Sequence, residues 1–273
     1  MVGAVEPDPV TTPTPSDTGS ASVSFRDAIA EIGLSNGPLN LVTKGLLRAL
    51  NRIFADLAIR DDVRCVILHG GEARAFCAGS DIKEFAEIYR DASERKILYE
   101  DMVLRNLARL PMPTIAAMDG PALGGGLELA LCCDLRILRN GVRIGLPECH
   151  LGGLAGNGSV RLTRLVGPAR AKEMLFTGMT ITSGQALDWG VVNRVAMDGS
   201  ALEEARRLAQ EIARRGPVSN RLAKVLVNAS LDTSLDGALS QSTIAQQKIF
   251  DSLDLREGAD AFFAKRTPVF HGR

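Results

Sequence analysis

Two short apolar runs, each followed by a glycine-rich segment, constrain the fold of this chain more than any other feature of its sequence. The first run is residues 65–68 and the second is residues 114–118. Runs of this kind are typical of strands that are buried on both faces of a sheet. The segments that follow, 76–81 and 120–128, contain glycines that allow unusual dihedral angles and a close approach of a ligand to the backbone. If they lie side by side, they can direct two N–H donors at one oxygen atom, which is an oxyanion hole.

The rest of the chain predicts alternating strands and helices that give way to helices alone. Strands are expected at residues 29–34, 135–138, 142–144 and 191–195, with Asn140-Gly141 as a hairpin turn between the second and third of these. Helices are expected at 46–57, 82–109, 127–131, from Pro168, from Thr182 to Gly190, and at 200–215, 218–230, 235–252 and 256–266. The order indicates an α/β core with a helical C-terminal segment.

Three parts of the chain differ in composition. Residues 1–22 contain four prolines among serines and threonines and predict a disordered tail, because such a segment cannot bury enough apolar surface. Residues 23–199 predict the α/β core, and residues 200–273 predict the helical segment. The length of 273 residues, of which 45% are hydrophobic, suffices for a large core.

Charge and cysteine content exclude several classes of function. Lys plus Arg and Asp plus Glu both number 32, so the net charge is zero and nucleic acid is not expected as the main partner. The 5 cysteines form no Cys-x-x-Cys pair, which indicates reduced thiols in a cytoplasmic protein without a metal site. No signal peptide and no membrane-spanning run of about 20 apolar residues is evident.

Two glutamates accompany the second glycine-rich segment. Glu128 lies in the first turn after three consecutive glycines, and Glu148 follows the predicted strand at 142–144. Either residue alone would most simply be a surface carboxylate, and the glycines alone would most simply form tight turns. Together they suit general acid–base chemistry at a carbon next to a carbonyl group. His150 is expected to have a structural, hydrogen-bonded role, and no Gly-x-Ser-x-Gly elbow supports a hydrolase.

The combination resembles the enoyl-CoA hydratase/isomerase (crotonase) superfamily over roughly residues 26–272. The motifs that carry the resemblance are residues 78–83 (Ala-Gly-Ser-Asp-Ile-Lys), 124–130 (Gly-Gly-Gly-Leu-Glu-Leu-Ala), 133–136 (Cys-Asp-Leu-Arg), 146–148 (Leu-Pro-Glu), and the tail from Gly258 to Phe270. The resemblance implies the ClpP/crotonase fold, a spiral of ββα units with a helical C-terminal trimerisation segment.

The resemblance also implies roles for individual residues. The backbone N–H groups of Ser80 and Gly125 would hold the thioester oxygen of a coenzyme A substrate, and Glu128 and Glu148 would hold one water molecule. Hydratases of the family carry both glutamates, so the expected activity is hydration or dehydration of a 2-enoyl-CoA. Residues expected to bind the substrate are Ala78, Asp81, Ile82, Lys83, Gly124 and Lys265. Coenzyme A is part of the substrate, and no permanently bound cofactor is expected.

This chain departs from the family pattern at two places. Ser80 stands where alanine is common, and residues 152–159 lack the proline of the usual glycine-rich segment. These departures leave the acyl group open, as does the mixed polarity of residues 85–102, which are expected to line its pocket. Isomerisation, or another reaction at a thioester enolate, is the alternative within the family. A non-catalytic, RNA-binding member is the alternative from a different class.

The helical segment is expected to mediate assembly. Apolar residues between Leu208 and Phe263 recur at helical spacing and supply more apolar surface than one edge of a core readily covers. The resemblance implies a homotrimer or a hexamer made of two trimers, with Lys265 near a neighbour's coenzyme pocket. The simpler alternative is a tail that folds back on its own core.

Overall fold

A six-stranded sheet forms the centre of the protein in this computed structural model, which describes residues 21–273. The strands, in their order across the sheet, are β1 (Ala21–Arg26), β2 (Ile29–Leu34), β3 (Cys65–His69), β4 (Thr114–Met118), β6 (Leu135–Arg139) and β9 (Arg194–Ala196). The pair β1–β2 is antiparallel, and the other neighbours are parallel. The predicted tail lies outside the described residues, except that its last two residues belong to β1.

A small second sheet corrects the predicted hairpin at residues 135–144. It contains β5 (Ala122–Leu123), β7 (Arg143–Gly145) and β8 (Thr180–Thr182), and β7 pairs with the other two. Strand β6 instead pairs with β4 and β9 in the large sheet. Asn140 and Gly141 do make a turn, because the N–H of Val142 donates to the carbonyl of Arg139, but the turn passes the chain from one sheet to the other.

The helices around the sheets follow the predicted positions with some differences at their ends. They are α1 (Lys44–Ala58), α2 (Ile82–Ala86), α3 (Leu98–Ala108), α4 (Gly125–Leu131), α5 (Gly156–Thr177), α6 (Ser183–Asp188) and α7 (Ala201–Ala213), with short turns η1 (Tyr89–Asp91), η2 (Ser93–Ile97) and η3 (Glu148–Leu151). The expected helix at 82–109 is therefore interrupted, and η2 is a π-helical turn. Pro168 restarts α5 after a kink at Gly167, and Thr182 forms the expected capping box with Gln185.

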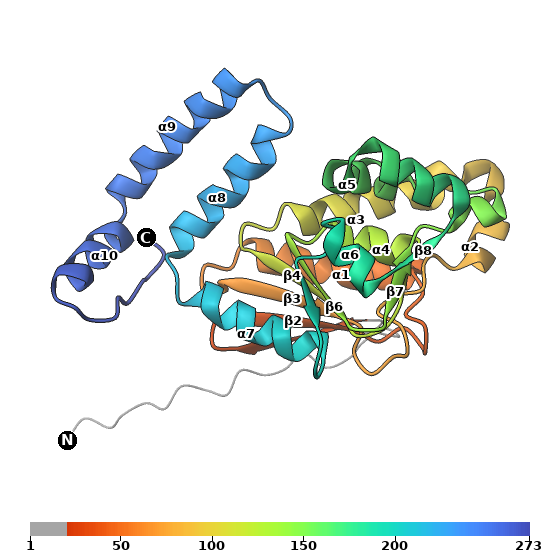
Figure 1. Ribbon diagram of the computed structural model, residues 1–273, viewed down its shortest axis with the longest axis horizontal. Helices are drawn as coiled ribbons and strands as arrows, with labels where there is room; N and C mark the ends of the chain where they lie inside the picture. Colours follow the sequence, from red (N-terminus) through yellow and green to blue (C-terminus); the bar gives the residue numbers. More distant parts are fainter. Residues whose placement is uncertain (1–20) are drawn as a thin grey trace.

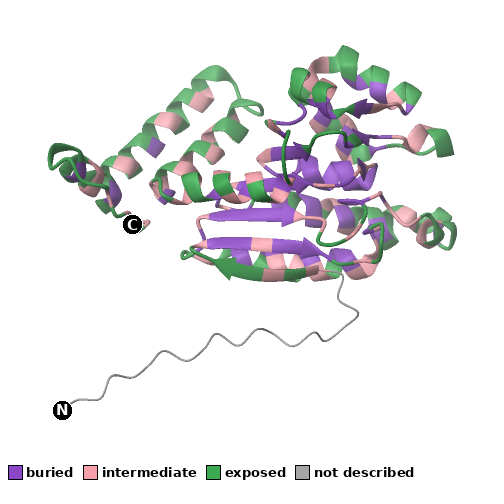
Figure 2. Cartoon of the chain, turned by 60° about the horizontal axis from the view of Figure 1, so that its bottom comes forward, coloured by how far each residue is buried: buried purple, intermediate pink, exposed green. Residues whose placement is uncertain are grey.

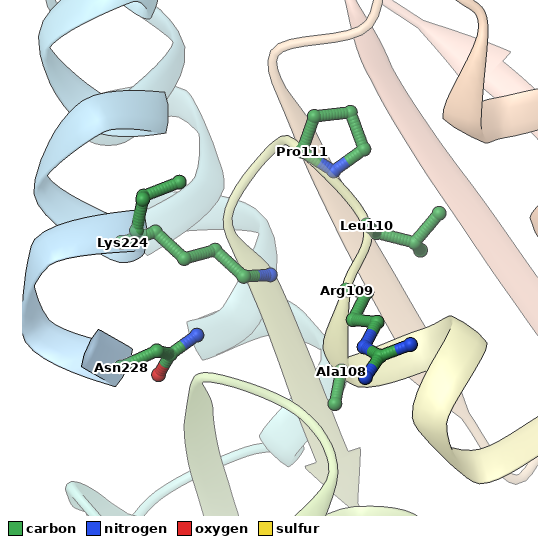
Figure 3. Close-up of a pocket in the computed structure, with 7 residues that line it drawn as sticks. Ala108, Arg109, Leu110, Pro111, Lys224 and Asn228 are labelled. Carbon is green, nitrogen blue, oxygen red and sulfur yellow. The ribbon is translucent and has the colours of Figure 1, made fainter. Parts of the chain in front are cut away.

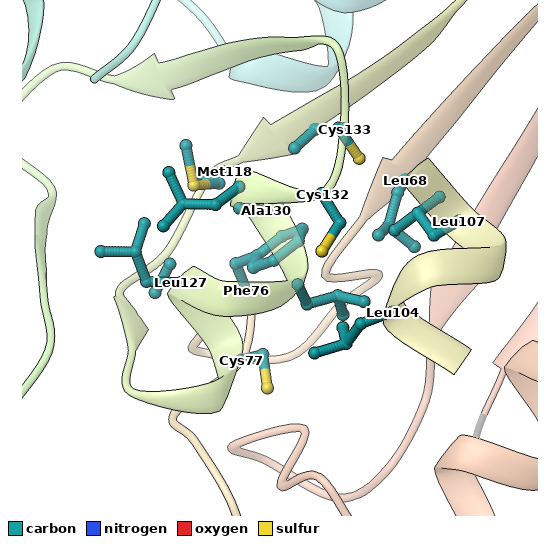
Figure 4. Close-up of a cluster of buried hydrophobic side chains, with 14 of the residues drawn as sticks. Leu68, Phe76, Cys77, Leu104, Leu107, Met118, Leu127, Ala130, Cys132 and Cys133 are labelled. Atoms are coloured by element: carbon teal, nitrogen blue, oxygen red, sulfur yellow. The ribbon is translucent and has the colours of Figure 1, made fainter. Parts of the chain in front are cut away.

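Alternation along β3 explains how the large sheet is covered on both faces. Val66 and Leu68 point into one apolar cluster, with α1, α3 and α4, while Cys65 and Ile67 point into another, with α7. Side chains of successive strand residues lie on opposite faces, so a continuous apolar run is needed where both faces are packed. Figure 2 shows the central strands of the large sheet as buried. Figure 4 shows side chains of the first cluster around α4.

Three further helices form an arm that extends from the core. These are α8 (Pro217–Ser230), α9 (Leu235–Asp251) and α10 (Leu253–Phe263), and α8 leaves the core beside α7 (Figure 1). Lys224 joins α8 to the core through an ion pair of 2.7 Å with Asp134. Within residues 21–273, no helix is long and apolar enough to cross a membrane.

Candidate active site

The two glycine-rich segments lie side by side, as the sequence predicts. The N–H of Cys77 donates to the carbonyl of Pro121 at 3.3 Å, and the N–H of Leu123 donates to the carbonyl of Cys77 at 3.0 Å. Gly126 then passes so close to this bridge that a Cβ atom there would lie 2.0 Å from the Cys77 oxygen. Only glycine allows this approach, which brings the start of α4 against the segment at 76–81.

The backbone N–H groups of Ser80 and Gly125 face the same gap. Val42 lies beside Ser80 and is hydrogen-bonded to both of its neighbours. The N–H of Val42 donates to the carbonyl of Gly79, and the N–H of Asp81 donates to the carbonyl of Val42. The N–H of Ser80 therefore points away from Val42, toward Gly125. A Cβ atom on Gly125 would lie 3.6 Å from the nitrogen of Ser80. Within residues 21–273, neither N–H group has a hydrogen-bond acceptor, so both are available to a bound oxygen.

Glu148 packs against the turn that opens α4. Gly124 adopts φ +53°, and a Cβ atom there would lie 2.7 Å from Oε1 of Glu148, so both the dihedral and the contact favour glycine. The other oxygen, Oε2, is buried and has no hydrogen-bond partner in the described part of the chain. Burial is the main reason why the pKa of Glu148 is raised to about 7; a hydrogen bond from its own backbone opposes the rise, and the charge of nearby Glu128 adds to it.

Glu128 is more buried and better hydrogen-bonded than Glu148. Its side chain is 8% exposed, and its Oε1 accepts a hydrogen bond of 2.7 Å from the N–H of Gly158, at the start of α5. Burial raises the pKa of Glu128, while the N–H groups of Gly158 and Asn157 and the positive charge of Arg161 oppose the rise. The structure thus brings together two carboxylates with different proton affinities beside two free N–H donors.

A third carboxylate, which the sequence reasoning missed, lies in the same place. Glu100 of α3 is 7% exposed, and its Oε1 lies 3.5 Å from where a Cβ atom on Gly125 would be. Burial raises the pKa of Glu100 to about 7; the positive charge of Lys96 and a hydrogen bond from Ser80 oppose the rise, while the charge of Glu128 adds to it. The sequence does carry a signal for it: Glu100 shares helical spacing with the buried Val103 and Leu107, so it occupies the inner face of α3.

The residues expected to bind the substrate separate into two groups. Ala78, Asp81, Ile82 and Lys83 lie in or next to the first glycine-rich segment, with Gly124 beside it. The side chain of Asp81 caps α2 by accepting from the N–H of Lys83 at 3.0 Å, and Lys83 and Ile82 are exposed. Lys265 comes directly after the C-cap of α10, and α10 lies at the end of the molecule opposite α2 (Figure 1). The structure of the single chain therefore does not bring Lys265 to the glutamates, because the arm extends away from its own core.

Other candidates from the sequence have structural contacts. His150 is hydrogen-bonded to the carbonyl of Thr177 at 2.9 Å, as expected for a structural histidine. The hydroxyl of Ser159 donates to the carbonyl of Ala155 within α5. A groove of about 240 Å³ between α8 and the end of α3 is lined by Leu110 and Lys224 among others (Figure 3), and it contains none of the three carboxylates.

Comparisons with known proteins agree with this geometry. A family model described as enoyl-CoA hydratase/isomerase matches residues 24–273. The Short-chain-enoyl-CoA hydratase of Clostridium acetobutylicum is 34% identical over 229 residues, covering 84% of this chain and 88% of the relative. The Enoyl-CoA isomerase/hydratase fer4 of Mycosarcoma maydis is 38% identical over 214 residues, covering 76% and 77%.

Solved structures share the whole fold. The enoyl-CoA hydratase from Bacillus anthracis superposes with a TM-score of 0.89 at 34% identity, over 93% of this chain and 100% of that chain. Pseudomonas aeruginosa DspI superposes with a TM-score of 0.90 at 30% identity, over 95% and 100%. The predicted crotonase-like α/β fold with a helical C-terminal region is thereby confirmed. This chain belongs to the enoyl-CoA hydratase/isomerase family, within the crotonase superfamily.

Proposed function

We propose that this protein hydrates 2-enoyl-CoA thioesters and catalyses the reverse dehydration. The observation that carries the proposal is the convergence of Glu128 and Glu148 beside the free N–H groups of Ser80 and Gly125. Two donors hold one oxygen that gains negative charge, and two carboxylates handle the protons of one water molecule. Coenzyme A enters as part of the substrate, and the reaction requires no resident cofactor.

The reaction balances with these groups alone. As the water oxygen bonds to C3 of the enoyl group, Glu128 takes one of the water protons. The electrons of the C2–C3 double bond move to the thioester oxygen, which the two N–H groups stabilise as an enolate. Glu148 then donates a proton to C2, and a proton passes from Glu128 back to Glu148 to restore the site.

The two pKa environments support this division of roles. The pKa of Glu148 is raised to about 7, so its neutral form is populated near neutral pH, as a proton donor requires. Burial raises the pKa of Glu128 as well, but the hydrogen bonds from the N–H groups of Gly158 and Asn157 oppose that rise and favour the ionised form, which suits a proton acceptor. Environments that push apart the proton affinities of two carboxylates are a common basis for acid and base roles.

Assembly into a homotrimer or a hexamer is part of the proposal. Arm residues such as Phe262 and Phe263 are 78% and 81% exposed, which supports contacts with other copies of the chain. In such an assembly, Lys265 and Lys83 from different protomers would meet the phosphates of coenzyme A. All five cysteines are free, which supports a cytoplasmic location.

The test is to follow the loss of absorbance of the conjugated thioester after the protein is added to 2-butenoyl-CoA. The proposal expects turnover that requires both Glu128 and Glu148. Conversion of 3-butenoyl-CoA without hydration would favour the isomerase alternative, which the name of the Mycosarcoma maydis relative also suggests. Binding of RNA, with no reaction of any enoyl thioester, would favour the non-catalytic alternative.

A further inference from the structure

Glu100 has an environment that a purely structural carboxylate would not be expected to have. It is 7% exposed, and its Oε2 is buried without a hydrogen-bond partner in the described part of the chain. Leaving a buried polar atom unpaired is costly, because the atom loses its hydrogen bonds to water without replacement. Buried polar atoms are therefore nearly always paired, and an unpaired one next to a reaction site is a candidate contact for a bound ligand.

The nearest positive charge does not pair with Glu100. Lys96 is fully buried in η2, but its ammonium group donates to the carbonyl of Val42 at 3.0 Å and lies 3.1 Å from Oε2 of Glu84. The ammonium also sits 4.4 Å above the ring of Phe85. Lys96 thus lowers the pKa of Glu100 from a distance while its hydrogen bonds are made to other residues.

Glu100 lies beside the two residues whose N–H groups we assign to the thioester oxygen. Its Oε1 and the hydroxyl of Ser80 lie 3.5 Å and 3.1 Å from the same point, where Gly125 would carry a Cβ atom. Gly125 also supplies one of the two N–H groups that we assign to the thioester oxygen. The hydroxyl of Ser80 and the carboxylate of Glu100 together make the surroundings of Gly125 polar.

We propose that Glu100, together with the Ser80 hydroxyl, selects acyl-CoA thioesters whose acyl group carries a hydroxyl beyond the double bond. The inference rests on the proposed function and names its substrate class. A hydroxyl donates to the unpaired Oε2, whereas an unsubstituted alkyl chain leaves Oε2 unpaired in the closed complex. Sites built to bond a substrate hydroxyl reject the analogue without it, because their buried polar groups are then left without partners.

Binding and turnover are measured with matched thioester pairs. For binding, calorimetry compares 4-hydroxybutanoyl-CoA with butanoyl-CoA, and 5-hydroxypentanoyl-CoA with pentanoyl-CoA. For turnover, kcat/KM is compared for 4-hydroxy-2-butenoyl-CoA and 2-butenoyl-CoA. A hydrogen bond to a charged group predicts a preference of about 10-fold or more for a hydroxylated member. Glu100→Leu is expected to abolish that preference, and Glu100→Gln to retain part of it.

The controls separate this inference from the proposed function and from misfolding. Glu94→Leu removes an exposed carboxylate one and a half turns earlier and should leave every ratio unchanged. Circular dichroism and thermal unfolding establish that Glu100→Leu is folded. The inference is overturned if both binding ratios are near one, or if Glu100→Leu leaves them unchanged. Absence of turnover with any enoyl thioester would reject the proposed function, while the binding ratios would still decide the role of Glu100.

Discussion

Helices α4 and α9 show how differently the core and the C-terminal arm of this chain are packed. All seven residues of α4 are buried, including Glu128, whereas Ala245 is the buried residue among the 17 of α9. Each position of α4 is packed against other parts of the same chain. At Gly126 only a glycine leaves room for the carbonyl group of Cys77. The core therefore forms the candidate active site within one chain, while the arm has an apolar surface that its own chain leaves open.

The polar groups of the two regions differ in the same way. In the core, one buried oxygen of Glu100, one of Glu148 and the N–H groups of Ser80 and Gly125 have no hydrogen-bond partner within the described residues. In the arm, it is apolar surface that lacks partners, since Ile244, Phe262 and Phe263 are all more than half exposed. We infer that a small molecule binds the unpaired polar groups of the candidate active site, and that further copies of the chain cover the apolar surface of the arm.

Replacing Glu148 by Gln should cause the largest loss of activity among the substitutions in the candidate active site. The variant keeps the shape of the side chain but removes the proton donor, so hydration should fall by about 10²–10⁴-fold. Glu128→Gln should cause a loss of similar size. Steady-state kinetics with 2-butenoyl-CoA measure both, and near-normal turnover of Glu148→Gln would contradict the assignment.

The backbone donors can be tested at Ser80. Proline there removes the N–H but leaves intact the hydrogen bonds of Gly79 and Asp81 to Val42, because those use neighbouring groups. Loss of one donor should reduce kcat by about 10²–10³-fold. Ser80→Ala, the matched control, should change turnover of 2-butenoyl-CoA only slightly. A folded Ser80→Pro enzyme with full activity would remove this N–H from the site.

Substitutions in the arm should change the assembly of the protein rather than the folding of the chain. Changing Phe262 and Phe263 to Ser removes apolar side chains whose burial is worth about 1.5–3 kcal/mol each. Light scattering should then show a shift from three or six chain masses toward the single-chain mass of 29.1 kDa. The control is Ile59→Ser, which changes an apolar residue that is 83% exposed but lies on the α/β part of the chain rather than on the arm. It should leave the mass unchanged. A monomeric, fully active wild type would refute the assembly.

The smallest expected effect is on the pH dependence of stability. Burial raises the pKa of Glu100 from an ordinary value of 4.5 to about 7, so between these values the folded state holds a proton that the unfolded state has lost. The stability associated with this proton is therefore full below 4.5 and is lost as pH rises through about 7. Urea unfolding at pH 4 and at pH 8 measures how much the free energy of unfolding falls between the two. That fall should be smaller in Glu100→Gln than in the wild type, by on the order of 2 kcal/mol. An unchanged loss would place the titration elsewhere.

Local patterns predicted much of the fold because they report local constraints. The apolar runs at 65–68 and 114–118 become β3 and β4, and the capping box at Thr182 starts α6 as expected. Strand β1 was not predicted because it begins within the segment assigned to the tail, and four of its six residues are exposed at the edge of the sheet. The strand expected at 191–195 starts later, since Val191 and Val192 first donate to Ala186 at the end of α6.

Residue type and spacing along the chain were enough to predict most of the strands and helices, the two glycine-rich segments and the pair Glu128 and Glu148. That β6 and β7 join different sheets, and that α10 and the residues after it lie far from the carboxylates, follows from the tertiary structure. It also decided that Glu100 reaches Gly125 across the fold. The physical reason is that burial and electrostatic environment arise from contacts between distant segments, which no spacing in the sequence encodes.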